Sequence, residues 1–76
     1  MNRQRHLVEL EIEIVVEGMT YGYTARVYGE APTEWDERRG DTQEQAITYA
    51  KSAALERVAQ LDAIPDVVRF RIEGVE

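Results

Sequence analysis

The chain has 76 residues, no cysteine and a formal net charge of −6 at pH 7. A chain of this length forms one domain, and the lack of cysteine excludes disulfide bonds, thiolate chemistry and cysteine-ligated zinc. The negative charge disfavours nucleic acid as the main ligand, because contacts to phosphate need a surplus of Lys and Arg. No apolar run has the length of a membrane span. We therefore expect a cytoplasmic protein, with residues 1–6 as a flexible arm and residues 7–76 as the single domain.

Residues 8–17 alternate between apolar and mostly acidic side chains, and this period of two predicts a half-buried strand. Gly18–Met19 is a candidate for a two-residue turn, so the second strand is expected over residues 20–28. A turn at this place aligns Ile14 with Tyr23 and puts all the large apolar pairs on one face of the sheet.

Residues 30–40 are rich in charge and show no sustained periodicity, which predicts a surface loop. A short edge strand over residues 35–38 is the alternative for this segment.

Residues 42–61 are expected to form a helix. Thr42 is the predicted N-cap, and Gln45 completes a capping box three residues later. The residues at helical spacing that form the predicted buried stripe are Ile47, Ala50, Ala54, Val58 and Leu61. Pro65 ends the helical segment. The last strand is expected over residues 67–73, with its inward side chains at Val68, Phe70 and Ile72.

These elements predict a two-layer α+β domain, in which one helix covers one face of a sheet of three to four strands. The other face has no helix left to cover it. Because that face carries glutamates and arginines, it is expected to be either solvated or the surface of an oligomer.

The order of the elements, together with the run Gly40-Asp41-Thr42 at the start of an alanine-rich helix, resembles the HicB-like family. Residues 23–27 stand at the place of the aromatic-led second strand of that family. Residues 31–35 replace its usual Pro-Gly-Cys-like turn. The resemblance implies a β-β-(short β)-α-β arrangement, which is a reduced form of the RNase-H-like fold.

HicB-like proteins are best known as antitoxin partners of RNA-cleaving HicA-type toxins. The resemblance therefore implies a non-enzymatic protein-interaction module that binds and neutralises a small basic toxin-type ribonuclease, without a cofactor. Because the chain ends just after its last strand, we expect a stand-alone domain that lacks the DNA-binding part of longer family members and does not bind nucleic acid directly. The alternative is a stand-alone homo-oligomer, a dimer or tetramer, of unassigned role and without a toxin partner.

Five residues are candidates for partner binding: Tyr28, Trp35, Asp36, Arg38 and Arg39. Aromatic residues and arginine are enriched at the energetic centres of interfaces. The alternative for Trp35 is packing over the edge of the helix, with the arginines offsetting nearby acids.

The glutamates of the first strand could bind a divalent metal, but they are expected to be neutralised by arginines. The glutamates are Glu9, Glu11, Glu13 and Glu17, and the arginines are Arg26, Arg69 and Arg71. No catalytic, metal-binding or cofactor-binding residue is predicted. His6, the only histidine, is expected to be a free side chain in the terminal arm.

Overall fold

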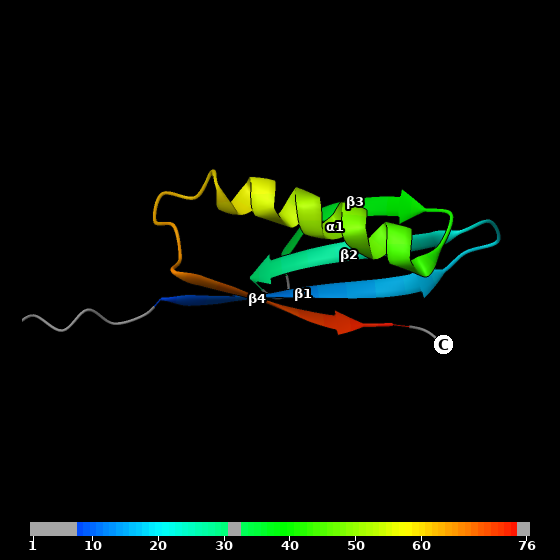
Figure 1. Cartoon of the computed structure of the whole chain (residues 1–76), viewed down its shortest axis with the longest axis horizontal. Helices are drawn as coiled ribbons and strands as arrows, with labels where there is room; N and C mark the ends of the chain where they lie inside the picture. The colour runs from blue at the N-terminus through cyan, green and yellow to red at the C-terminus, as the bar shows by residue number, and fades with distance from the viewer. Residues whose placement is uncertain (1–7, 31–32, 75–76) are drawn as a thin grey trace, which may run out of the picture.

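The computed structural model describes residues 8–30 and 33–74, so the predicted terminal arm and His6 lie outside the described residues. The elements in chain order are β1 (Glu9–Gly18), β2 (Tyr23–Glu30), β3 (Thr33–Gly40), α1 (Gln43–Val58) and β4 (Val67–Glu73). Figure 1 shows the helix lying along the sheet in a second layer. The predicted two-layer α+β fold is confirmed at this level. The helix is not long and apolar enough to cross a membrane.

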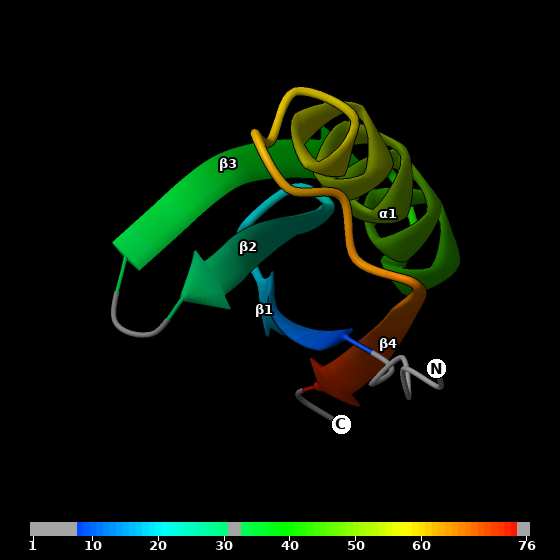
Figure 2. The ribbon, with the colours of Figure 1, turned by 90° about the vertical axis from the view of Figure 1, so that its left-hand side faces the viewer.

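The sheet has the strand order β3-β2-β1-β4. The first three strands form an antiparallel meander, whereas β4 lies parallel to β1 on its other side. A parallel neighbour requires a crossover connection, which α1 provides. In Figure 2 the helix covers one face of the curved sheet, and β3 and β4 form its two edges. The opposite face, called the open face below, has no helix.

The predicted turn between the first two strands is wrong. The connection is the four-residue loop 19–22, closed by a hydrogen bond of 2.9 Å that the N–H of Met19 donates to the carbonyl oxygen of Gly22. Gly22 rather than Gly18 has a positive φ, +84°. A Cβ on Gly22 would also lie 2.5 Å from the carbonyl oxygen of Gly40, so the loop packs directly on the end of β3.

The longer loop shifts the register by four residues from the prediction. Ile14 pairs with Val27 instead of Tyr23, and Val16 pairs with Ala25. A shift by an even number leaves every side chain on its predicted face, because the side-chain period of a strand is two. The faces of the two strands were therefore predicted correctly although the pairing was not, and Tyr21, which was expected opposite Val16, lies in the loop and is 93% exposed.

The segment predicted as a surface loop, with a short edge strand over residues 35–38 as the alternative, is β3, a longer strand of eight residues along the edge of the sheet. Its pairing with β2 changes register beside Val27 and Tyr28, which face Asp36 and Glu34 respectively, so Trp35 is an extra residue between two pairs. This β-bulge breaks the alternation of side chains. The strand is held by its backbone pairing with β2, which does not depend on its side chains. Its charged sequence therefore shows no apolar alternation from which a strand could be predicted.

The helix begins as predicted. The N–H of Gln45 donates to Oγ1 of Thr42 at 3.0 Å, and Oε1 of Gln45 accepts from the N–H of Asp41 at 2.9 Å. The α-helix ends at Val58, earlier than predicted, but a tighter turn follows, in which the N–H of Leu61 donates to the carbonyl oxygen of Val58 at 3.1 Å. Leu61 therefore still packs against the core.

The core lies between the helix and the helix-facing side of β1 and β2. Its buried residues are Ile12, Ile14, Val16, Ala25, Val27, Ala46, Ala50, Ala54 and Val58. Small helix residues allow a close approach to the sheet, and a Cβ on Gly40 would lie 2.5 Å from the backbone nitrogen of Ala46. The predicted inward residues Val68 and Phe70 pack against this core, but Ile72 is 40% exposed, because α1 packs mainly on β3 and β2.

Candidate functional site

The structure does not gather the five residues predicted for partner binding into one surface. Residues that pair across two strands share a face of the sheet. Asp36 and Arg38 pair with Val27 and Ala25, so they lie on the side of the helix. The other members divide between the two faces. Tyr28 and Arg39 lie on the open face, whereas Trp35 packs against the core on the side of the helix.

Trp35 packs over the edge of the helix, which is the alternative stated for it from the sequence. The guanidinium carbon of Arg57, on α1, lies 5.5 Å from the centroid of the indole ring, within range of a cation–π interaction. On its other side the indole occupies the space above Gly29, where a Cβ would overlap it. Trp35 therefore fastens β3 to the helix, and its half-buried ring is not a free anchor for a partner.

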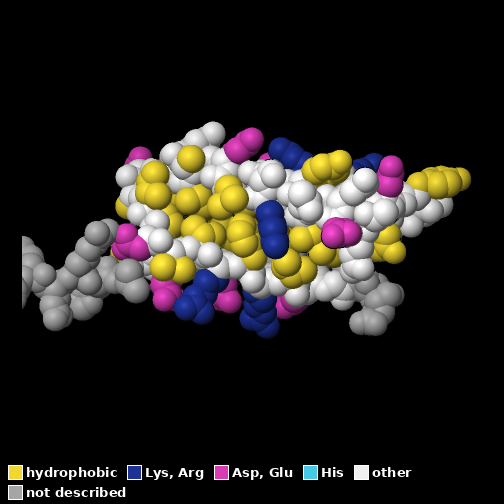
Figure 3. Space-filling model, viewed as in Figure 1, with side chains coloured by type: hydrophobic (Ala, Val, Ile, Leu, Met, Phe, Trp, Pro, Cys, Tyr) yellow, Lys and Arg dark blue, Asp and Glu magenta, His cyan; other side chains and the backbone are white. Residues whose placement is uncertain are grey.

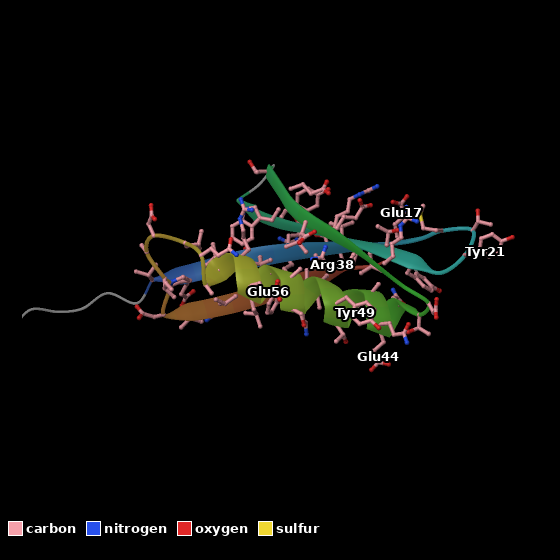
Figure 4. The ribbon with its side chains drawn as sticks, turned by 90° about the horizontal axis from the view of Figure 1, so that it is seen from above. Glu17, Tyr21, Arg38, Glu44, Tyr49 and Glu56 are labelled. Atoms are coloured by element: carbon pink, nitrogen blue, oxygen red, sulfur yellow. The ribbon has the colours of Figure 1, made fainter. Side chains whose placement is uncertain are left out.

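The charged residues of β3 behave differently from one another. Nη1 of Arg38 lies 2.6 Å from Oδ1 of Asp36, which also accepts a hydrogen bond of 2.7 Å from the N–H of Glu37. In Figure 4 Arg38 lies beside the helix, while Tyr21 projects from the far tip of the β1–β2 loop. Arg39 forms no ion pair with any residue that the structure describes.

The glutamates of β1 form a charge ladder with arginines on the open face. Arg26 contacts Glu17 at 3.3 Å, and Arg69 contacts Glu9 at 3.5 Å, so the expected neutralisation is confirmed for these two glutamates. These pairs are exposed and contribute about 0.2–1 kcal/mol each at most. Among residues 8–30 and 33–74, no group of three or more acidic or histidine side chains is arranged to hold a metal ion.

Glu13 is the exception on this face. Two charged residues of β4 lie close to Glu13, the expected Arg71 and also Glu73. A hydrogen bond that the protonated carboxyl of Glu13 donates to the carboxylate of Glu73 holds the pKa of Glu13 above its ordinary value of 4.5, and burial and charge repulsion from Glu73 act in the same direction. Arg71 is held by Glu73, with Nε 3.4 Å from Oε2.

The surface with the clearest shape for binding lies at one end of the domain and was not predicted. Here the start of β1 meets the connection between α1 and β4, leaving an open pocket of about 340 Å³. This pocket is called the end pocket below, and it is lined by Val8, Glu9, Leu10, Leu61, Asp62, Ala63 and Pro65. Figure 3 shows hydrophobic side chains gathered in a band between α1 and β4 that extends to this end of the molecule.

The end pocket has an apolar floor and an acidic rim. Val8 is 55% exposed, and the neighbouring Ile64 is 60% exposed. The lining also includes two acidic residues, Asp62 and Glu9, of which Glu9 is paired with Arg69. The carboxylate of Asp66 fixes the start of β1, since its Oδ2 accepts a hydrogen bond of 3.1 Å from the N–H of Val8. An apolar surface with a carboxylate beside it can receive an aliphatic side chain that ends in a positive charge.

The sequence held one signal for this pocket. Ile64 and Pro65 continue a run of apolar residues, after Leu61 and Ala63, in the connection between α1 and β4. A connection that exposes Ile64 departs from the polar composition expected of a loop.

Comparison with protein-family models, with curated protein sequences and with solved structures finds no match for this chain.

Proposed function

We propose that the domain is a non-enzymatic protein-interaction module whose end pocket binds a small basic protein. The observation that carries this proposal is the combination of exposed apolar residues with an acidic rim in the end pocket. An interface needs an apolar centre that water leaves on binding, and the charges around it select the partner. A net charge of −6 attracts a positively charged partner over the whole surface.

The partner class that fits best is a toxin-type ribonuclease, with the present chain acting as its HicB-like antitoxin. Such an enzyme must attract RNA phosphates, so its active surface is basic, and an acidic protein that covers this surface blocks it. The support is the resemblance described for the sequence, together with an element order that agrees with it once β3 replaces the predicted loop. The resemblance includes the start of α1 at Thr42. The side chains of Thr42 and Gln45 form hydrogen bonds with backbone N–H groups there, as expected at the start of a capped helix.

The test is co-expression with the small basic protein encoded by the adjacent reading frame, followed by affinity capture and an RNA-cleavage assay. The proposal expects a stable complex and stoichiometric inhibition of RNA cleavage. A neighbour that forms no complex, or a complex that cleaves RNA at an undiminished rate, would refute the antitoxin role.

Two substitutions locate the binding surface. Val8→Lys places a positive charge in the end pocket, whereas Leu55→Lys places the same charge on the exposed surface of α1. Val8 and Leu55 are 55% and 50% exposed, so neither change disturbs a packed core. Val8→Lys is expected to weaken binding by on the order of tenfold or more, through lost apolar burial and charge repulsion. Equal effects of the two variants would place the contact elsewhere.

A further inference from the structure

The two edges of the sheet differ in how well they are protected from pairing with another strand. β3 carries a bulge beside Trp35, and its side chains are mostly charged. Bulges and charges are devices that natural sheets use to protect an edge. β4 pairs with β1 over its whole length, Val67–Glu73, without an irregularity. It is therefore the edge that remains regular and able to pair.

Backbone groups of β4 point alternately toward β1 and away from it. The N–H of Val67 donates to the carbonyl oxygen of Val8 at 3.2 Å, so Val67 points toward β1. By the alternation of a strand, Arg69, Arg71 and Glu73 do the same, whereas the N–H and C=O groups of Val68, Phe70 and Ile72 point toward the free edge. In Figure 2 β4 is the last strand of the sheet on this side, and α1 lies over one face of the sheet.

We infer that β4 pairs antiparallel with β4 of a second copy of this chain, with Arg71 at the two-fold axis. In this register Phe70 of each copy lies opposite Ile72 of the other, and these are the residues whose backbone groups face the edge. Both apolar pairs lie on the side of the helix, where Ile72 is otherwise 40% exposed. The pairing thus extends the apolar band and satisfies the free backbone groups together.

The charges on the open face exclude one neighbouring register, and the apolar residues disfavour the other. With Arg71 at the axis, Arg69 of each copy lies opposite Glu73 of the other, which gives two pairs of opposite charge. A register centred on Phe70 would instead put Arg69 opposite Arg71 twice, and like charges in direct opposition destabilise a sheet. A register centred on Ile72 would oppose Arg71 and Glu73 twice, but it would place Phe70 against Gly74 and lose both pairs of Phe70 with Ile72.

The single unfavourable pair in the chosen register is Arg71 against its own copy at the axis. Each Arg71 already has a carboxylate beside it, since its Nε lies 3.4 Å from Oε2 of Glu73 in the same chain. Glu13 stands next to this pair from β1 and is influenced by both residues. These carboxylates offset the repulsion between the two guanidinium groups.

This contact is independent of the proposed function, because no residue of β4 lines the end pocket. It gives a geometry to the homo-oligomer that the sequence suggested. Both of its tests use the chain alone, so their outcome does not depend on whether a basic partner exists.

The first test is disulfide cross-linking, for which the chain has no competing cysteine. Opposed residues in a non-hydrogen-bonded antiparallel pair have Cα atoms about 4.5 Å apart, which a disulfide can bridge. Arg71→Cys is therefore expected to form a covalent dimer under mild oxidation. Arg69→Cys is the matched control, because its equivalent lies four residues away along the strand, roughly 13 Å, beyond the reach of a disulfide. Arg39→Cys tests the other edge.

The second test exchanges charges. Homodimers of Arg69→Glu would oppose glutamates twice, and homodimers of Glu73→Arg would oppose arginines twice. A mixture of the two variants regains both pairs of opposite charge. Each variant alone is expected to raise the dimer dissociation constant on the order of tenfold, and the mixture is expected to form heterodimers at the affinity of the unaltered chain. Arg39→Glu, the same charge change on β3, should leave the dimer unaffected.

Light scattering measures the oligomeric state directly, because a monomer has a mass of 8.7 kDa and a dimer has twice that mass. A clean monomer at micromolar to millimolar concentration overturns the inference. So does efficient cross-linking through Arg69→Cys or Arg39→Cys with none through Arg71→Cys. Cross-linking through Arg71→Cys alone, together with heterodimers from the mixed charge variants, establishes the pairing and its register.

Discussion

The same substitution, threonine to valine, is expected to have opposite effects on stability at Thr24 and at Thr42. Thr24 is buried to 1% exposure, and its Oγ1 has no hydrogen-bond partner among the residues that the structure describes. Thr42 is exposed, and its Oγ1 accepts the hydrogen bond from the N–H of Gln45 that caps α1. Replacing each by valine exchanges a hydroxyl for a methyl group. The contributions of the unfolded chain are therefore nearly the same in the two variants.

The sign of each effect follows from the partner of the hydroxyl. Burying a hydroxyl without a hydrogen bond costs about 1–3 kcal/mol in protein mutants, so Thr24→Val is expected to raise the free energy of unfolding by about 1–2 kcal/mol. Valine is also well suited to a strand. Thr42→Val removes a helix cap and is expected to lower the free energy of unfolding by about 1 kcal/mol. For a domain of this size, each kcal/mol corresponds to about 4–8 °C in Tm.

Urea denaturation followed by circular dichroism measures both effects. All variants are compared at one protein concentration, because any dimer would make the apparent stability depend on concentration. The midpoint should move up for Thr24→Val and down for Thr42→Val at a constant slope m. If Thr24→Val is as destabilising as Thr42→Val, the buried hydroxyl has a hydrogen-bond partner in solution and the reasoning fails.

Three further predictions follow from close approaches and from charge. Gly29→Ala would drive a Cβ into the indole of Trp35, so the fluorescence emission of this single tryptophan should shift to longer wavelength as the ring is displaced toward water, whereas an unchanged spectrum would contradict the packing. Gly40→Ala should destabilise the domain by more than the change of residue type alone, because its Cβ would meet the backbone at the start of the helix, and thermal unfolding measures the loss. The raised pKa of Glu13 stabilises the fold fully below the ordinary value of 4.5, and this contribution is lost as the pH rises through the folded-state pKa. Glu73→Gln should bring the NMR titration midpoint of Glu13 back toward 4.5, and a midpoint that does not move would remove Glu73 as the cause.

The elements most accurately predicted from the sequence are those with one strong apolar period. The alternation in β1 and β4 fixed their extents to within a residue, and Thr42 was identified as the helix N-cap from residue type and spacing alone. These features are local, so neighbouring residues are enough to specify them. The end of α1 was placed three residues late because the apolar spacing continues to Leu61 through a tighter turn.

The wrong predictions concern features that depend on contacts between distant segments. Gly22 is needed in the β1–β2 loop because the loop meets Gly40, which no local pattern reveals. β3 is a strand because β2 offers it a free edge, although its own side chains favour a loop. The five predicted binding residues do not share one surface for the same reason, since the bulge at Trp35 changes which face each neighbour occupies.

A shift in register by an even number of residues keeps each side chain on the same face of the sheet, but it changes which residues lie opposite one another. The residues that fold the domain need only the correct face, whereas the residues that bind a partner strand need the correct opposite residue. Burial of Ile14 and Val27 requires only that each lies on the side of the helix, which any even register provides. The proposed interface through β4 requires Arg69 to lie opposite Glu73, and a shift of the axis to Phe70 replaces this pair by Arg69 opposite Arg71, which repel. The apolar pattern therefore determines the fold of this chain with little information about its partners. The charges on β4 carry the information about pairing, and exchanging them in two separate copies is the experiment that reads it.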